Sequence, residues 1–302
     1  MSKQRKLSYL FSILWVAILF AAIMGAVATG VINSYYSGIL VLIGINIILA
    51  VSLNLVTGFL GQLVLGHAGF MSVGAYSAAL FTMHAGLPIS VAFPLGLIFG
   101  GLVAAIFGVI IGVPALRLRG DYLAIITLGF GEIIRVLVLA VDFTGGAAGL
   151  TGIPYIEGKY TLIIYTFFIA FLTVVAILAF IRSRHGRAVI AIREDEIAAE
   201  ASGINTTYYK LLAFVVAAFF AGVAGGIYAH YIGVLDPSKF DFNYSVEILI
   251  MVVLGGMGSI TGSVCSATVL TLLPEMLRSF ADKRMLIYSL VLIIVMLFKP
   301  CL

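Results

Sequence analysis

Charged side chains within apolar stretches are the first candidates for chemistry in this sequence. Glu132 and Arg135 lie three residues apart in one such stretch, Glu247 lies near the start of another, and His67 follows a glycine-rich run. Charged groups inside a membrane are costly and commonly mark ion or proton paths. They also form structural pairs near span ends, and the spacing of Glu132 and Arg135 suits a pair on one helical face. We favour structural pairing over a proton relay, because few of these groups lie at the centre of an apolar stretch.

Hydrolytic and nucleotide chemistry is supported by no motif. Ser259 and His67 could supply a nucleophile and a base, but they belong to no G-x-S-x-G, H-E-x-x-H or C-x-x-C pattern. A phosphate-binding loop is missing as well, because Gly158 and Lys159 are followed by Tyr160 and lack the upstream glycine. We therefore expect no catalytic residue, no metal site and no cofactor in this chain. If ATP powers its function, another subunit must bind the ATP.

A long charged segment, residues 181–210, is the second candidate for a functional site. It lies in a chain of 302 residues that is 63% hydrophobic and only 10% charged. Glu194, Asp195 and Glu196 come early, alanines follow, and Gly203 closes the run, a pattern typical of a short helix. Such a helix on the wet side of a membrane bundle is suited to contact another protein.

Apolar segments predict the elements that must position these groups. A helix needs about 20 residues to cross a hydrocarbon core of about 30 Å, and the segments here are continuously apolar, as helices in lipid need to be. We predict an all-α integral membrane protein, one domain over residues 1–302, with about ten transmembrane helices and no fewer than eight. The predicted spans are 7–28, 38–57, 66–84, 89–113, 122–142, 160–181, 208–232, the short glycine-interrupted 243–257, 262–280 and 285–299.

The placement of lysine and arginine predicts the orientation. With ten spans, most basic clusters fall on one side, which we take as the cytoplasm, and Lys283 and Arg284 are the exception. Both termini are then cytoplasmic, and the net charge of +4 implies no nucleic-acid partner. The basic clusters on the cytoplasmic side are Lys3, Arg5 and Lys6; Arg117 and Arg119; Arg182, Arg184, Arg187 and Arg193; and Lys299.

The basic start and Ala26-Val27-Ala28 also resemble a cleavable signal peptide, but the apolar run is longer than usual, so we predict a retained first helix.

Two glycine-punctuated regions, 58–69 and 255–262, interrupt the predicted spans. Glycine lets helices approach closely, and it also permits broken backbone where a cavity is lined. Each region lies one span beyond a long helix in its half of the chain, a spacing that indicates a duplicated arrangement of the kind many transporters have. In the first region we favour a role in a path through the protein, because Gln62 and His67 add polar groups there.

Five stretches of the chain, in order, resemble the LivM-type permeases of branched-chain amino-acid ABC importers. The resemblance covers nearly the whole chain. The matching stretches are LNLVTGFLGQLVLGHAGFMSVGAYSAAL (53–80), PALRLRGDYLAIITLGFGEIIRVL (114–137), TGGAAGLTGIP (144–154), SRHGRAVIAIREDEIAAEASGIN (183–205) and GGMGSITGSVCSATVLTLLPEMLR (255–278).

The resemblance implies a fold, partners and sites. It implies an ABC importer permease in a prokaryotic plasma (inner) membrane, paired with a LivH-type sister permease, two cytoplasmic ABC ATPase subunits and an extracytoplasmic substrate-binding protein. The cytoplasmic coupling loop would be 182–207, and the loop at 144–154 would face the binding protein or form an outer gate. The implied ATPase-coupling residues are Arg193, Glu194, Asp195, Glu196, Ala199 and Gly203. The candidates for the path or gate are Gln62, Gly66, His67, Gly69, Gly145, Gly146 and Gly149.

Other functions stay open at the level of sequence. Within the same importer class, urea and short amides are alternative cargoes. An ion-coupled secondary transporter or a channel is a second class, and it would need an ionisable residue at mid-membrane and activity from this chain alone. An intramembrane enzyme is a third class, which no motif supports.

Overall fold

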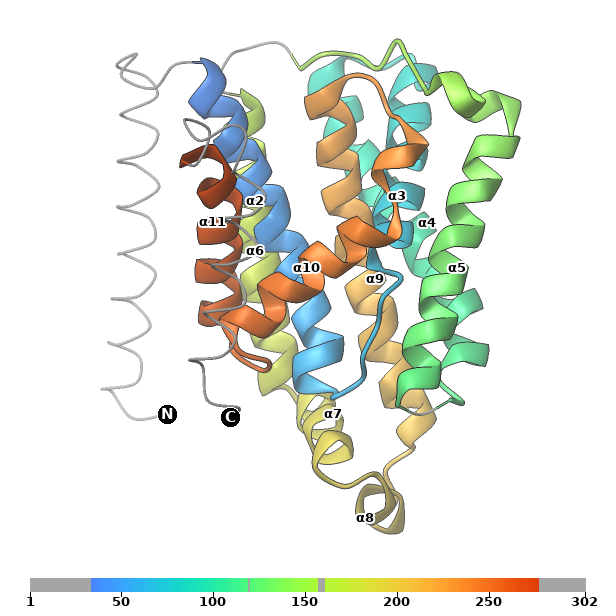
Figure 1. Cartoon of the computed structure of the whole chain (residues 1–302), viewed down its shortest axis with the longest axis vertical. Coiled ribbons are helices and arrows are strands. Elements are labelled where there is room, and N and C mark those ends of the chain that lie inside the picture. Colours follow the sequence, from blue (N-terminus) through green and yellow to red (C-terminus); the bar gives the residue numbers. More distant parts are fainter. Residues whose placement is uncertain (1–33, 119, 157–160, 277–302) are drawn as a thin grey trace.

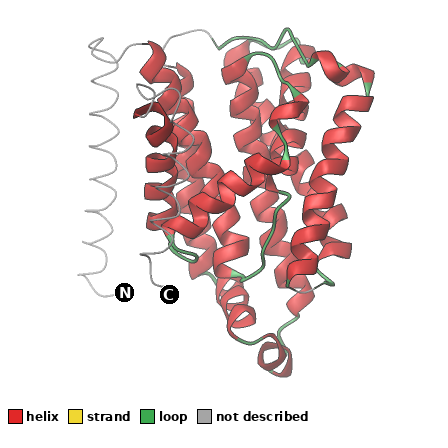
Figure 2. Ribbon diagram, in the orientation of Figure 1, coloured by secondary structure: helices red, strands yellow, loops and turns green. Residues whose placement is uncertain are grey.

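The computed structural model describes residues 34–118, 120–156 and 161–276. Within these ranges the chain is helical, with short loops and a single antiparallel bridge between Leu150 and Leu235 (Figure 2). The helices stand side by side in one bundle (Figure 1). The elements are α2 (Ser34–Asn54), the π-helix η1 (Leu55–Phe59), α3 (His67–His84), α4 (Ile89–Ala115), α5 (Asp121–Ala140), η2 (Asp142–Thr144), η3 (Gly146–Ala148), α6 (Thr161–Arg182), α7 (Arg184–Glu194), α8 (Glu196–Ala201), α9 (Thr206–Ile232), η4 (Pro237–Lys239), α10 (Phe242–Gly255) and α11 (Ile260–Met276).

Five of these helices are long and apolar enough to cross a membrane, which confirms the all-helical prediction. They are Tyr35–Phe59, Ile89–Ala115, Asp121–Ala140, Thr161–Arg182 and Thr206–Ile232. Helices α3 and α11 coincide with two further predicted spans, 66–84 and 262–280. The predicted spans 7–28 and 285–299 lie outside the described residues, so the total of ten is a prediction that the described helices do not establish.

The prediction of a span at 243–257 is not matched by a spanning helix. Helix α10 has 14 residues, which at 1.5 Å per residue is about 21 Å long, shorter than a hydrocarbon core. Figure 1 shows it crossing the bundle obliquely from a start at mid-height.

The extended segment 60–66 also covers only part of the height of the bundle. It leaves the lower end of α2 and climbs to mid-height, where α3 begins (Figure 1).

Small residues let the central helices touch through their backbones. A Cβ added to Gly74 of α3 would lie 2.2 Å from the Cα of Gly222 in α9. One added to Gly225 would lie 2.0 Å from the carbonyl oxygen of Met71. Packing of this kind drives helix association in lipid, where apolar side chains gain little by leaving the hydrocarbon. The core of the bundle is therefore α3, α4 and α9, together with the largely buried α2.

Candidate functional site

The charged segment folds into two short helices, α7 and α8, that project from one end of the bundle (Figure 1). Ser183 caps α7 by accepting hydrogen bonds from the backbone N–H groups of His185 and Gly186. Asp195 separates the two helices and caps α8 by accepting from Ile197 and Ala198. Gly203 ends the segment with a φ of +82°, a conformation that favours glycine. Asp195 and Gly203, predicted as coupling residues, thus shape the segment.

Helix α8 is fastened to the first turn of α9. The Glu196 carboxylate lies 2.7 Å from the Lys210 ammonium, whose side chain is only 4% exposed. The Thr206 hydroxyl donates to the Glu200 carboxylate at 2.7 Å. These two contacts fasten α8 to the long helix α9, which is part of the bundle core.

One of the predicted coupling residues, Ala199, does not lie on the exposed surface of α8. Ala199 is buried, with 4% of its surface exposed, and packs against the chain's own core. Ile197, two residues earlier, is 73% exposed. Glu194, at the end of α7, has 72% of its side chain exposed. The sequence did not indicate Ile197 as a contact residue, because an isoleucine in an alanine-rich run is usually a core residue. In the six-residue α8 its side chain lies on the surface.

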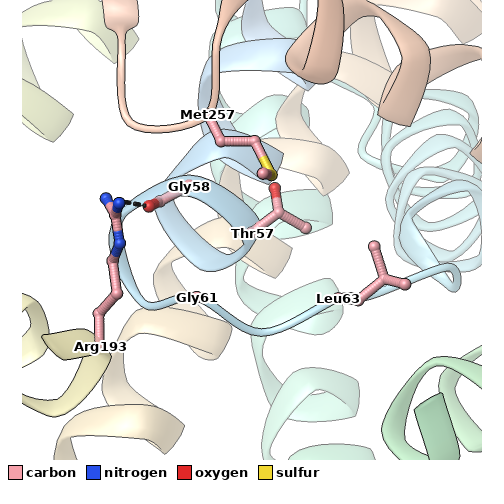
Figure 3. Close-up of a pocket in the computed structure, with 6 residues that line it drawn as sticks. All are labelled: Thr57, Gly58, Gly61, Leu63, Arg193 and Met257. Atoms are coloured by element: carbon pink, nitrogen blue, oxygen red, sulfur yellow. Dashed lines mark hydrogen bonds between the residues drawn. The ribbon is translucent and has the colours of Figure 1, made fainter. Parts of the chain in front are cut away.

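Arg193 turns away from α8 and toward the end of α2. Its Nη1 donates a hydrogen bond of 2.9 Å to the carbonyl oxygen of Gly58, in η1 (Figure 3). The side chain forms one wall of a cavity of about 310 Å³ at this end of the bundle. The cavity is lined by Thr57, Gly58, Gly61, Leu63, Arg193 and Met257.

The two glycine-punctuated regions meet at this cavity. Asn54 is fully buried and its Oδ1 accepts a hydrogen bond of 2.9 Å from the backbone N–H of Gly258. The same side chain donates to the carbonyl of Ser259 and the hydroxyl of Ser263. A Cβ on Gly58 would lie 2.2 Å from the nitrogen of Gly258, so the two backbones are in direct contact. The end of α2 and the turn between α10 and α11 form one unit.

The start of α3 lies in contact with α5 and α10. A Cβ on Gly66 would lie 2.3 Å from the carbonyl oxygen of Thr127, and one on Gly69 would lie 2.9 Å from Gly131. The Ser245 hydroxyl of α10 accepts from the backbone N–H of Ala68 at 3.1 Å. Gly66 and Gly69 are therefore required for close packing at this helix start.

Polar side chains near this helix start have different roles. His67 is buried and its Nε2 lies 2.9 Å from the Ser52 hydroxyl, so it joins α3 to α2. It is not near enough to pair with Ser259, whose hydroxyl contacts Thr261 and the Gly262 backbone instead. Gln62 is half-buried, and its Oε1 has no hydrogen-bond partner among the described residues.

A small surface hollow lies beside the starts of α3 and α10. Glu132 of α5 reaches its wall and accepts a hydrogen bond of 2.7 Å from Arg135, which confirms the pair expected from their spacing. Asp241, the N-cap of α10, forms part of the same wall and accepts from the backbone of Tyr244. The lining residues are Leu65, Gly69, Leu128, Gly131, Glu132, Phe240, Asp241, Phe242 and Ser245.

The glycine-rich loop lies at the opposite end from α8 (Figure 1). Gly145, Gly146 and Gly149 all have positive φ, at +83°, +54° and +80°. Leu150 and Leu235 exchange two backbone hydrogen bonds of 3.0 Å, which fasten the loop to the segment that leads to α10. These glycines lie in the loop, whereas Gly66, His67 and Gly69 belong to the start of α3, so the seven path candidates do not form one cluster.

The bundle and its helix starts at mid-height define a multi-pass membrane protein of the transporter class, since discontinuous helices at this depth are typical of transporters. A family model described as branched-chain amino acid transport system / permease component matches residues 35–299. The chain belongs to this family. It is a permease component and not an enzyme.

Two relatives illustrate the similarity. The chain is 39% identical over 287 residues to the high-affinity branched-chain amino acid transport system permease protein LivM of Salmonella typhimurium, a match that covers 85% of this chain and 67% of the relative. It is 33% identical over 135 residues to LivH of Escherichia coli, over 44% of each chain. The LivH match shows that the two permease types share part of their sequence.

One solved structure supports the fold. PsaBC from Streptococcus pneumoniae in complex with Fab aligns with a TM-score of 0.51 and 14% identity, over 93% of this chain and 96% of that chain. At this identity the likeness concerns the helix arrangement alone.

Proposed function

We propose that this chain is the transmembrane permease subunit of an ATP-driven importer of branched-chain amino acids in a prokaryotic plasma membrane. The observation that carries the proposal is the 39% identity to a LivM permease over 85% of the chain. The proposal extends to the partners: two cytoplasmic ATPase subunits, a sister permease of the LivH type and an extracytoplasmic binding protein.

The α7–α8 segment supports an ATPase on its side of the membrane. It is polar, projects from the bundle, exposes Ile197 and is fastened to α9 by the pair of Glu196 and Lys210. Arg117 follows α4 by two residues, and α4 ends at the same end of the bundle (Figure 1). Basic residues at one end support a cytoplasmic location for that end under the positive-inside rule. The glycine-rich loop then faces outward, where a binding protein would dock.

The surface formed by α10, segment 60–66 and α5 supports a path shared with a second permease. Non-helical backbone at membrane depth is tolerated only where protein or water covers it, and Gly61 and Leu63 in this segment are exposed. Segment 60–66 lines both hollows, with Gly61 and Leu63 at the one beside Arg193 and Leu65 at the one beside Glu132. A sister permease placed here would close the path and cover the backbone.

Reconstitution tests the proposal directly. The chain is co-expressed with a candidate sister permease, ATPases and binding protein from the same organism, and the complex is placed in proteoliposomes. We expect uptake of leucine, isoleucine and valine that requires both ATP on the ATPase side and the binding protein.

Three other outcomes would redirect the assignment. Uptake of urea or acetamide in place of leucine changes the cargo and keeps the class. Uptake by this chain alone under an ion gradient identifies a secondary transporter. A complex that fails to recruit any ATPase rejects the importer class.

A further inference from the structure

The carbonyl group of Gly58 lies in η1, the π-helical turn that ends the helix begun by α2. Leu60 donates to Leu55 and Gln62 donates to Val56, so neither backbone N–H beyond Gly58 turns back to its oxygen. Carbonyl groups in the last turn of a helix lack intrahelical partners and are satisfied by other groups. Here the guanidinium of Arg193 satisfies Gly58 at 2.9 Å. A cation at this position also suits the negative end of the helix dipole.

The Arg193 side chain, which donates to Gly58, is packed against backbone on two sides. Gly61 has a φ of +76°, and a Cβ there would lie 3.0 Å from Cγ of Arg193. A Cβ on Gly258 would lie 3.1 Å from Nη1 of Arg193. The Arg193 side chain therefore lies between segment 60–66 on one side and the α10–α11 turn on the other (Figure 3).

Two residues separate Arg193 from the start of α8 at Glu196. Arg193 is the next-to-last residue of α7, and Asp195, the cap of α8, follows Glu194. A displacement of α8 by a partner would reach the bundle by two routes, the contacts with α9 and this short connection. The only hydrogen bond described between the α7–α8 segment and the α2–α3 region is the one from Arg193 to Gly58.

We infer that Arg193 is a positioning residue that couples movement of α8 to the end of α2, and through it to the cavity wall formed by Thr57, Leu63 and Met257. This inference rests on the proposed function. It gives Arg193 a role different from the ATPase contact that we propose for Glu194 and Ile197. The Arg193 side chain is 42% exposed, its Nε lies 4.0 Å from the Glu194 carboxylate, and its Nη1 is bonded to the permease's own backbone at Gly58. π-Helical turns are often found at functional sites, and η1 provides the deformable element.

Three variants of the reconstituted importer test the inference: Arg193→Ala, Arg193→Lys and, as a matched control, Arg187→Ala. Arg187 is an exposed arginine of the same helix, and its guanidinium donates to the carbonyl of Arg182 at 3.4 Å. The measurements are ATPase co-purification, ATP hydrolysis and leucine uptake per ATP hydrolysed.

We expect Arg193→Ala to keep the ATPases bound and to hydrolyse ATP, while uptake per ATP falls about tenfold, a size typical of coupling between sites. Arg193→Lys should recover part of the coupling, because an ammonium can donate one hydrogen bond to Gly58. Arg187→Ala should behave as the unmodified protein. Loss of ATPase binding in Arg193→Ala would show that Arg193 contacts the partner and would overturn the inference. Unchanged uptake per ATP would overturn it equally.

A thiol-labelling experiment keeps the inference testable if the cargo is not leucine. Cys265 and Cys301 are replaced by serine, and Leu63→Cys is labelled with a charged methanethiosulfonate with and without ATP and vanadate. In the protein that retains Arg193, we expect ATP and vanadate to change the labelling rate of Leu63→Cys. In the Arg193→Ala variant, we expect the labelling rate to be the same with and without nucleotide. A rate that responds to nucleotide equally in both overturns the coupling role. Failure of the unmodified complex to bind any ATPase would instead reject the proposed function.

Discussion

Lys210 and Glu196 form an ion pair of 2.7 Å in which the lysine, on the first turn of α9, is almost fully enclosed and the glutamate is a quarter exposed. The pair explains how an exposed six-residue helix holds a fixed position. Helix α8 is too short to be stable alone, since isolated helices need about 12–15 residues to be even marginal in water. Its geometry comes from its attachment to α9.

Replacing Lys210 by alanine should therefore release α8. The change removes the ion pair that holds Glu196, and because the Glu196 carboxylate is partly solvated, we expect a loss of about 2–3 kcal/mol. Thermal unfolding of the purified chain and limited proteolysis within α8 measure the effect. Glu194→Gln serves as the control, because Glu194 is largely exposed and should change neither readout. Equal protease resistance of Lys210→Ala and the unmodified chain would contradict the expectation.

Ile197 should contribute more to partner binding than Ala199. Ile197→Asp changes an exposed side chain, so we expect the unfolding temperature to stay the same while ATPase co-purification is lost. Ala199→Glu places a carboxylate in a buried position and should lower the unfolding temperature first. Co-purification and thermal unfolding of both variants separate docking from local folding. The assignment fails if Ile197→Asp still binds the ATPases normally.

Gly225→Ala should weaken the packing of α9 against α3. The added Cβ would lie 2.0 Å from the carbonyl oxygen of Met71, so the backbones must separate. Overpacking of this kind costs about 1–3 kcal/mol. Gly129→Ala is the matched control, since a Cβ there meets nothing within 4 Å. Unfolding in a denaturing detergent series should show a shift for Gly225→Ala alone, and a shift of the same size for Gly129→Ala would refute the packing explanation.

Gly149→Ala should disturb the outer loop without affecting ATPase binding. Gly149 has a φ of +80°, and its Cβ would lie 2.6 Å from the carbonyl oxygen of Leu235. We expect the Leu150–Leu235 bridge to break and uptake from the binding protein to fall, while ATPases co-purify as before. Gly86→Ala controls for strain alone, because Gly86 also has a positive φ but a Cβ there meets nothing within 4 Å. Equal uptake defects in both variants would assign the effect to backbone strain.

The long helices and one local pair could be predicted from sequence because both depend on short-range patterns. The segment 208–232 was expected as a span and is found as Thr206–Ile232, and the pair of Glu132 and Arg135 follows from helical spacing. The contact between Arg193 and Gly58 joins residues 135 positions apart, and no local pattern carries that information.

The oblique α10 and the buried Ala199 were missed for a related reason. An apolar run shows that a segment avoids water, but it does not show the angle at which a helix crosses the bundle. Nor does the sequence show which side of a short helix rests on the core. Tertiary packing decides both.

The extended segment 60–66 affects how much of this chain is stable in the membrane. Hydrocarbon tails cannot hydrogen-bond to non-helical backbone, so a copy left alone in the bilayer has a side that lipid solvates poorly. The exposed flanks of α4 and α6 have no such difficulty, because their surfaces are apolar helices. A cell that makes this chain in excess of whatever covers segment 60–66 would hold molecules with an unfavourable lipid boundary. We therefore expect a cell to make the two in similar amounts.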